Sequence, residues 1–357
     1  MAYSSITKPT DFFNTLLYTG TGAENALTGV GFQPDWIWLK KRGASGHHFL
    51  QDVVRGPTYQ LKSSTSDAET NNAQYVKSIQ SDGFTLGTDS DVNPNGGTAV
   101  AWNWKAGGSG STNNDGATAS TVSANTTSGF SIVTHTGTGS ATTIGHGLGA
   151  SPKVIISKAR NVVNSWFVQQ PFIGGSWTSS NYLILNSTAA VATASTMIDA
   201  VTNSTISFQG SNDWVNGNTY TYVHYCFAEK TGYSKFGTYV GNNNTNGTFV
   251  YTGFKPAWIL AKAASGSQTP QNQSWPLWDN KRSSTGGFNE NSYKLYPNAT
   301  DAEATSGIAQ VDILSNGFKF RNSTHQSNST NTYFYMAFAE EPLVANVGAN
   351  GVPATAR

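Results

Sequence analysis

The stretch GFQPDWIWLK at residues 31–40 decides the fold class of this 357-residue chain, because the chain contains three versions of it. It returns as GASPKVIISK at residues 149–158 and as GFKPAWILAK at residues 253–262. In each version a proline, which cannot donate a hydrogen bond to a β-ladder, precedes a mostly apolar run that ends in a lysine. A run this apolar predicts a central strand that is buried on both faces. We expect the strand to start after the proline and to end at the lysine, whose side chain reaches solvent.

Other phrases recur around this strand. A turn rich in Thr and Gly precedes it at residues 17–22, 134–139 and 237–242, and an aromatic strand closes each copy at residues 101–104, 225–227 and 335–338. The spacing indicates a unit of about 105–120 residues, the size of one small β-sandwich. We therefore predict an all-β protein of three tandem antiparallel β-sandwich pseudo-repeats, of the jelly-roll or lectin-like type.

The repeats suggest a division of the chain into segments. We expect repeat 1 at residues 11–107, repeat 2 at residues 129–232 and repeat 3 at residues 233–343. Residues 1–10 are expected to form an N-terminal arm, and residues 344–357 a C-terminal tail that docks on a neighbour or stays loose. Residues 108–128 have almost no apolar side chains, so a linker is predicted there.

The composition excludes several classes of protein. Charged residues make up only 11% of the chain, with 21 Lys and Arg against 20 Asp and Glu, so the protein has little electrostatic attraction for nucleic acid. The 10 Trp, 15 Tyr and 18 Phe residues can fill a large core, which argues against disorder. No secretory signal or membrane-spanning run is recognisable, and Cys226 is expected to be a small buried hydrophobe.

The sequence contains no recognisable signature of an enzyme, a cofactor site or a metal site, so we expect no catalytic residue and no cofactor. His224, in the closing strand of copy two, is expected to be a satisfied core or interface histidine. Copies one and three share an Asp-x-x-Arg element, Asp52 with Arg55 and Asp279 with Arg282. Each element predicts a local ion pair that fixes a loop, and copy two has no equivalent.

The segment DSDVNPNG at residues 89–96 alternates oxygen-bearing side chains as a calcium loop does. An EF-hand loop needs glycine at its sixth position and glutamate at its twelfth, where this chain has Pro94 and Val100. A polar hairpin is therefore the preferred interpretation, and adventitious calcium binding by Asp89, Asp91 and Asn93 stays open as the alternative.

Aromatic rings among Asn, Ser and Thr are typical of surfaces that bind sugars or proteins, because rings pack on apolar faces while amides and hydroxyls form hydrogen bonds. The competing interpretation is that these rings belong to the cores of the sandwiches. The candidate binding residues are Trp166, Trp177, Trp214, Trp275 and Trp278.

The chain resembles a family of virion-associated proteins of tailed bacteriophages, closest to those of marine and cyanobacterial phages. The resemblance is carried by GFQPDWIWLK at residues 31–40, SDGFTLG at 81–87 and AWNWKAGG at 101–108, and by later segments at 225–229, 251–257 and 353–357. It covers nearly the whole chain and implies a β-sandwich structural protein. The resemblance implies no catalytic residue in this chain.

This resemblance and the neutral composition lead to one functional expectation. We expect a non-enzymatic virion protein, a tail fibre or adhesin that recognises glycan on the host surface, located in the virion after assembly in the bacterial cytoplasm. The alternative is a capsid decoration or cement protein, and a polysaccharide depolymerase is least favoured because no carboxylate pair can be nominated. Expected partners are other virion proteins, host polysaccharide and further copies of the chain, as a trimer by analogy with phage fibres, but not nucleic acid or membrane.

Overall fold

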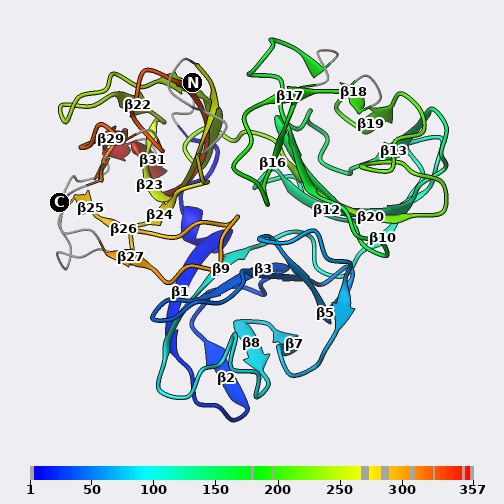
Figure 1. Cartoon of the computed structure of the whole chain (residues 1–357), viewed down its shortest axis with the longest axis horizontal. Helices are drawn as coiled ribbons and strands as arrows, with labels where there is room; N and C mark the ends of the chain where they lie inside the picture. The colour runs from blue at the N-terminus through cyan, green and yellow to red at the C-terminus, as the bar shows by residue number, and fades with distance from the viewer. Residues whose placement is uncertain are drawn as a thin grey trace.

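A computed structural model describes residues 4–177, 181–194, 197–266, 273–282, 289–305, 310–324, 326–347 and 350–353. Within these ranges the regular secondary structure is almost entirely β-strand, preceded near the N-terminus by a 3-10 turn, η1, at Pro9–Asp11. The strands form three units, each with a large and a small antiparallel sheet, and the units surround a common centre (Figure 1). The predicted all-β fold class is confirmed.

The strands belong to the three units in chain order. Unit 1 consists of β1 Phe13–Thr19, β2 Asn25–Thr28, β3 Trp36–Lys41, β4 Phe49–Asp52, β5 Gly56–Lys62, β6 Thr70–Asn71, β7 Val76–Gln80, β8 Gly83–Leu86 and β9 Thr98–Trp104. Unit 2 consists of β10 Ser111–Asn113, β11 Ser120–Asn125, β12 Phe130–Thr136, β13 Thr142–Gly145, β14 Val154–Ala159, β15 Trp166–Gln169, β16 Asn181–Ile184, β17 Ala192–Thr193, β18 Ile198–Val201, β19 Thr205–Phe208 and β20 Thr221–Phe227. Unit 3 consists of β21 Ser234–Val240, β22 Phe249–Tyr251, β23 Phe254–Ser265, β24 Leu277–Asp279, β25 Glu290–Asn291, β26 Tyr293–Lys294, β27 Ala304–Thr305, β28 Val311–Leu314, β29 Gly317–Phe320 and β30 Thr332–Pro342.

The three units share one strand order. The large sheets run β1-β9-β3-β4-β5-β6, β10-β11-β12-β20-β14-β15-β16-β17 and β21-β30-β23-β24, and the small sheets run β2-β8-β7, β13-β19-β18 and β22-β29-β28-β25. In every unit the closing aromatic strand therefore lies between the opening strand and the proline-led strand. The sequence repeat is thus a structural repeat.

The proline-led strand is central in all three large sheets, as predicted. Two details of that prediction are wrong. Pro256 lies inside β23 and not before it, and the ladder shifts register on both sides of Pro256, where a ring nitrogen without a hydrogen interrupts the pairing. The lysines at the ends of these runs, Lys40, Lys158 and Lys262, do not enter solvent but are fully buried.

The alternation of side chains along β3 explains why these strands are apolar on both faces. Ile37 and Leu39 point into the core of unit 1, whereas Trp36 and Trp38 point into a core that all three units share. Units 2 and 3 also have cores of their own, so the molecule has three sandwich cores around a fourth, common one. The common core is rich in aromatic side chains from all three units, including Trp104, Phe130, Tyr225, Phe227, Trp258 and Phe338.

The linker predicted at residues 108–128 is wrong, because this segment contains β10 and β11, which extend the large sheet of unit 2 beyond β12. Strand β11 pairs with β12 through Thr121 and Thr134, and Val122 packs into the core of unit 2. A strand at the edge of a sheet needs only backbone pairing and a few apolar side chains on its buried face. Its other positions can be small hydroxyl residues. Low apolar content therefore did not distinguish an edge strand from a linker.

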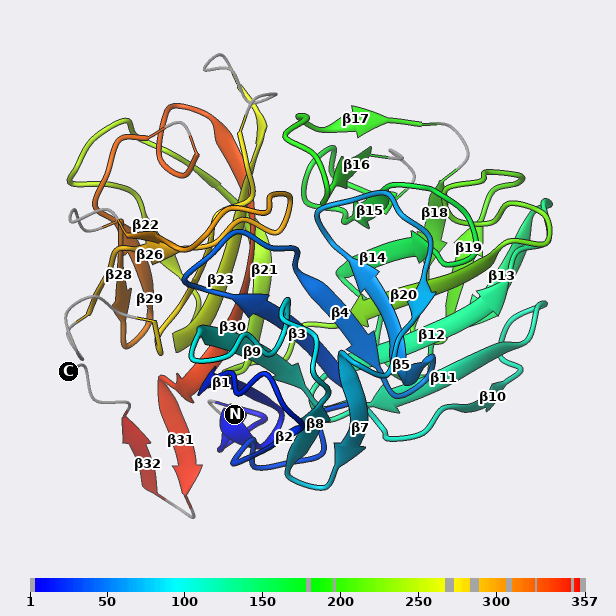
Figure 2. The same ribbon diagram turned by 60° about the horizontal axis from the view of Figure 1, so that its bottom comes forward.

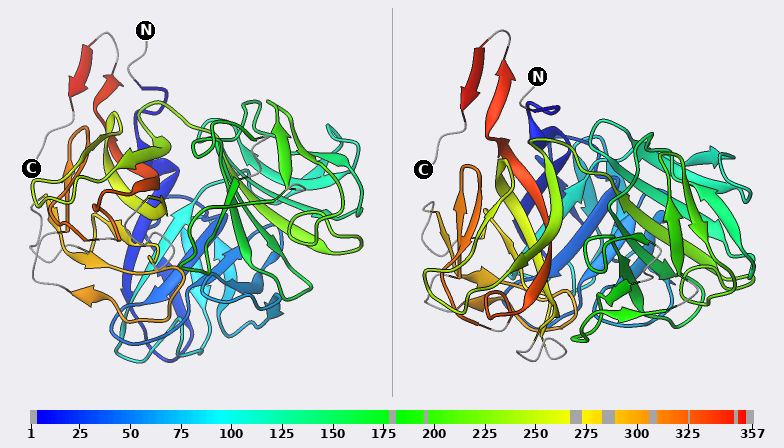
Figure 3. Two further views of the ribbon diagram at one scale, coloured as in Figure 1. Left: turned by 45° about the horizontal axis from the view of Figure 1, so that its top comes forward. Right: turned by 90° about the horizontal axis from the view of Figure 1, so that it is seen from above.

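Both ends of the chain differ from the predicted arm and tail. Near the N-terminus, Ile6 lies in the common core, and the Ser5 N–H donates to the Thr231 carbonyl at 3.1 Å. After β30 the chain forms an antiparallel hairpin of β31 Val344–Val347 and β32 Asn350–Pro353. This hairpin projects from the body (Figures 2 and 3). No helix in the described ranges has the length and hydropathy that crossing a membrane requires.

Candidate functional site

The chemically most distinctive groups lie between the units and occupy equivalent positions in each. The three buried lysines donate from Nζ to a backbone carbonyl of the neighbouring unit, in cyclic order. The pairs are Lys40 with Thr300 at 3.4 Å, Lys158 with Ser66 at 3.4 Å and Lys262 with Thr188 at 3.3 Å. Unit 1 thus contacts unit 3, unit 2 contacts unit 1, and unit 3 contacts unit 2.

Burial lowers the pKa of all three lysines, because a buried ammonium loses its hydration. The pKa of Lys40 and of Lys158 falls to about 8 and that of Lys262 to about 7. Carboxylates near the first two, such as Glu303 by Lys40 and Glu69 by Lys158, raise the pKa and partly offset burial. The pKa of Lys262 is set by burial, and it is the most strongly lowered of the three.

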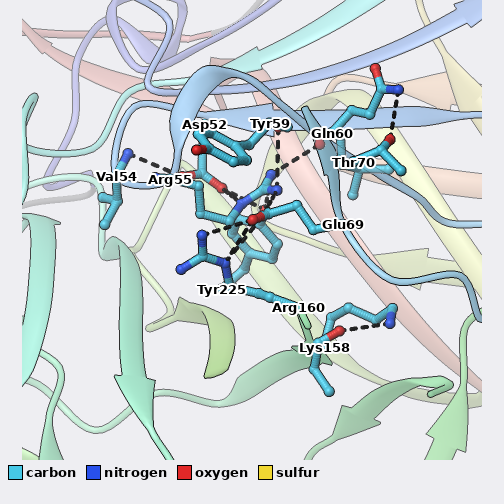
Figure 4. Close-up of polar contacts among 12 residues, drawn as sticks. Asp52, Val54, Arg55, Tyr59, Gln60, Glu69, Thr70, Lys158, Arg160 and Tyr225 are labelled. Atoms are coloured by element: carbon cyan, nitrogen blue, oxygen red, sulfur yellow. Dashed lines mark hydrogen bonds and ion pairs between the residues drawn. The ribbon is translucent and has the colours of Figure 1, made fainter. Parts of the chain in front are cut away.

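A buried ion network joins units 1 and 2 (Figure 4). Arg55 donates from Nε to Asp52 Oδ2 at 2.5 Å and from Nη1 to Glu69 Oε2 at 2.7 Å. Arg160 of unit 2 donates to the other oxygen of Glu69 at 2.8 Å, and the Tyr225 hydroxyl donates to Asp52 Oδ2 at 2.8 Å. Burial alone would lower the pKa of Arg55, but Asp52, Tyr225 and Glu69 outweigh it, so that pKa is raised and the guanidinium stays charged.

The same network recurs between units 3 and 1. Arg282 donates to Asp279 Oδ2 at 2.5 Å and to Glu303 Oε2 at 2.8 Å, and Arg42 of unit 1 donates to Glu303 Oε1 at 2.7 Å. The Trp102 indole N–H takes the place of the tyrosine and donates to Asp279 Oδ2 at 2.8 Å. The predicted Asp-x-x-Arg ion pairs are therefore confirmed, and each also ties two units together.

The third interface replaces this network with apolar groups. Ile173, Val191 and Ala264 stand where the other interfaces have Arg55, Glu69 and Arg160, and all three pack in the common core. The backbone is equivalent, since Val191 N donates to Ala264 O at 2.9 Å as Glu69 N donates to Arg160 O at 2.6 Å. Gln170 takes the place of Asp52 and accepts from Phe172 N and Ile173 N at 2.6 and 2.9 Å. The repeat thus tolerates either a complete set of charges or none.

These buried groups do not form a cleft for catalysis. Unit 2 also contains a row of three hydrogen-bonded side chains. Ser157 Oγ lies 2.8 Å from His224 Nδ1, and His224 Nε2 lies 3.1 Å from His135 Nδ1. Ser157 and His224 are fully buried, and burial holds the pKa of His224 well below its usual value, so the serine and histidine cannot meet a substrate. The prediction of a satisfied core histidine is confirmed. In the described part of the chain, no group of three or more His, Cys, Asp or Glu residues could hold a metal ion.

The loop at residues 89–96 uses Asn93 to hold a turn together. The fully buried Asn93 side chain accepts from Thr21 N at 2.8 Å and donates to the carbonyl oxygens of Ala23 and Gly87 at 2.5 and 2.7 Å. Asp91 pairs with Lys41 at 2.7 Å. This geometry favours the polar-hairpin interpretation over the calcium loop.

The same device recurs in units 2 and 3 through Asn216 and Asn328. Asn216 accepts from Thr138 N at 3.0 Å and donates to Ser140 O at 2.7 Å, and Asn328 donates to Asn244 O at 2.9 Å. The asparagine that closes this turn is therefore a fixed part of the repeat.

Three of the five candidate tryptophans are fully buried and cannot form a binding surface. Trp166 and Trp275 are buried in the common core and Trp278 in the core of unit 3, while Trp177 and Trp214 pack partly buried on the core of unit 2. Trp166 and Trp275 also donate across interfaces, to Lys62 O at 2.8 Å and to Ile184 O at 3.0 Å. For Trp278 the competing interpretation, a sandwich core, is the one observed. For Trp166 and Trp275 both interpretations are wrong, because the contact between units is a third environment. A binding role for the partly buried Trp177 and Trp214 stays a prediction.

Two exposed aromatic rings lie instead on β22, an edge strand of unit 3, and a third, that of Tyr59, lies on β5 of unit 1. The exposed fractions of Phe249 and Tyr251 are 42% and 58%. Beside Tyr251 is a cavity of about 440 Å³, at the base of the C-terminal hairpin. Its lining includes Tyr251, Thr252, Glu229, Lys235, Leu343 and Val344.

Sequence reasoning missed these rings, although an alignment of the three copies contains the signal. The register of the small sheets places Phe249 and Tyr251 opposite Lys319 and Gly317, just as Ala26 and Thr28 lie opposite Thr85 and Gly83 in unit 1. Thr143 and Gly145 hold these positions in unit 2. Only copy three has large side chains there.

Comparison with known proteins gives one family. No curated protein matches the chain. No solved structure matches it. A family described as Domain of unknown function (DUF7483) matches residues 8–342, from η1 to the end of β30. The matched range contains all three units and ends before the C-terminal hairpin, and with this coverage the chain belongs to the family Domain of unknown function (DUF7483).

Proposed function

We propose that the protein is a non-enzymatic structural component of a phage virion, a tail fibre or adhesin part that binds glycan on the host surface. The observation that carries the proposal is the contrast between a repeated interior and an unrepeated surface. The interior uses its charges in buried networks, and exposed aromatic rings occur on the small sheet of unit 3 beside a cavity. Such a body suits binding without chemistry, in which weak contacts are multiplied by the copies on a particle.

Two measurements test this proposal. A cryo-EM map or immunogold labelling of the virion that contains the chain is expected to place it on the tail. Purified full-length protein is expected to bind at least one polysaccharide on an array of bacterial O-antigens and capsular glycans. Release of oligosaccharides from those polysaccharides would contradict the non-enzymatic part of the proposal, and a blank array would contradict glycan recognition.

A capsid decoration or cement protein is the second candidate, and the projecting hairpin β31–β32 favours it. A two-stranded ribbon is marginally stable alone and offers unpaired strand edges to a neighbouring protein. Density on the capsid faces would support this role and refute the tail location.

The homo-oligomer expected by analogy stays a prediction. Light scattering of the purified protein distinguishes a monomer of 38.0 kDa from a trimer of three times that mass. A monomer would refute the analogy, and the three units of one chain would then take the place of three chains.

A further inference from the structure

The small sheet of unit 3 differs from its two counterparts in one respect that the fold does not require. At the two corresponding positions of the edge strand, unit 1 has the exposed residues Ala26 and Thr28. Unit 2 has Thr143 and Gly145, and Gly145 is buried beneath Asn113. These small residues support the same sheet in the same register. Unit 3 instead exposes the rings of Phe249 and Tyr251 to water, so a partner that covers them gains the free energy of burying apolar surface.

The cavity beside Tyr251 offers polar groups of both signs. Lys235 Nζ lies 3.3 Å from Glu229 Oε2, and Glu229 Oε1 accepts from Phe236 N at 2.8 Å, which fixes the carboxylate. The hydroxyl-bearing residues Thr231 and Ser234 complete the polar wall.

The cavity is also lined by an aromatic ring and by aliphatic side chains. Tyr251 lies over the turn at Gly253, whose φ is +80°, and a Cβ on Gly253 would be 3.6 Å from the Tyr251 hydroxyl oxygen. Leu343 and Val344, at the start of the hairpin, line the cavity with Tyr251. A volume of about 440 Å³ lies within the range of about 300–1,000 Å³ that is usual for small-molecule sites.

We propose that this cavity is a saccharide-binding subsite, in which a sugar ring stacks on Tyr251 while Lys235 donates to its hydroxyls and Glu229 accepts from them. A ring bounded by donors and acceptors matches a sugar, which has an apolar face and a polar edge. Phe249 lies two residues away on the same face of β22, about 7 Å along the strand, and contacts the neighbouring sugar of a chain. This subsite rests on the glycan recognition proposed above and assigns it to one place.

The test uses the full-length chain and the same array of bacterial O-antigens, capsular polysaccharides and their oligosaccharides. Tyr251→Ala is expected to weaken binding about tenfold or more, because it removes the stacking surface, whereas Tyr251→Phe keeps the ring and retains binding. Tyr59→Ala on β5 is the matched control, because Tyr59 is 37% exposed and lies in unit 1. Its affinity is expected to equal that of the unmodified protein.

The outcomes separate the subsite from the function. If the unmodified chain binds and Tyr251→Ala binds equally well, the subsite is refuted and glycan recognition stands. If the unmodified chain binds nothing on the array, both are refuted. Hydrogen exchange with the bound oligosaccharide is a second measurement, and protection is expected at residues 229–235 and 249–253. Protection confined to other segments would place the site elsewhere.

Discussion

The buried lysine of unit 3 leads to a stability difference that changes sign with pH. Lys262→Met removes an ammonium whose pKa burial lowers from 10.5 to about 7. Each pKa unit is worth about 1.4 kcal/mol, so below pH 7 the charged lysine costs the folded protein about 5 kcal/mol. The neutral amine, in contrast, keeps hydrogen bonds to Ala263 O at 2.7 Å and Thr188 O at 3.3 Å, each worth about 1 kcal/mol.

The sign follows from proton binding. Between pH 7 and 10.5 the unfolded chain holds a proton on Lys262 that the folded chain does not, so the stability of the unmodified protein rises with pH across this window. Methionine has no such dependence. The variant is therefore expected to be more stable by about 3 kcal/mol at pH 6, equal near about pH 9, and less stable by about 2 kcal/mol above about pH 10.5.

Urea unfolding of both proteins at pH 6 to 10, followed by tryptophan fluorescence, measures this difference. Groups that titrate equally in both proteins cancel in the subtraction. Lys281→Met is the control, because Lys281 is 48% exposed and its ammonium lies at the surface, 4.0 Å from Glu340 Oε1. A stability difference between Lys262→Met and the unmodified protein that is the same at pH 6 and pH 10 would refute the reasoning.

Three further predictions concern the interfaces and the asparagine turns. Glu69→Ala leaves Arg55 buried beside one carboxylate and should cost about 3–5 kcal/mol in urea unfolding. The fourfold change Asp52→Gln, Arg55→Ile, Glu69→Val and Arg160→Ala copies the third interface and leaves no buried charge unpaired, so it should be neutral or stabilising by about 1–4 kcal/mol. Equal losses in both variants would contradict the idea. Burial raises the pKa of Glu303, but Arg42 and Arg282 outweigh burial, so the pKa is lowered. The charged carboxylate should therefore stabilise the folded protein above its ordinary pKa near 4.5, and this contribution should be lost as pH falls. Between pH 5 and 3 the thermal midpoint of the unmodified protein should drop more steeply than that of Glu303→Gln. Asn93→Ala leaves buried backbone groups of the turn without a hydrogen-bond partner and should lower stability by about 1–3 kcal/mol. Added calcium should not raise the thermal midpoint of the unmodified protein. A rise would restore the calcium-loop alternative.

Much of the fold follows from local features of the sequence. The proline-led run predicts a central strand because a strand that is apolar on both faces must be covered on both, and β3, β14 and β23 have this position. The Asp-x-x-Arg spacing predicts ion pairs because residues three apart meet across a tight turn. Neither argument depends on where other parts of the chain lie.

The candidate site could not be predicted in the same way. The local sequence around Trp166 and Trp275 does not show whether these side chains face solvent, the core of their own unit or another unit. Lys40, Lys158 and Lys262 suggest an exit to solvent because an ammonium is normally hydrated, and only the neighbouring unit supplies the carbonyl that replaces water. The large side chains of β22 can be noticed in an alignment of the three copies, but only the register of the three small sheets identifies the equivalent positions.

The sequence by itself therefore determined that the protein has three antiparallel sandwiches and which strand is central in each. An apolar run such as GFQPDWIWLK specifies that both faces of its strand are covered, but not what covers the second face. Only the tertiary structure decided that the second faces of all three large sheets cover one another in a common core. The physical reason is that the free energy of burying apolar surface does not depend on which apolar surface covers it. The sequence therefore predicts that both faces are covered, but the packing of three units around one centre determines what covers the second face.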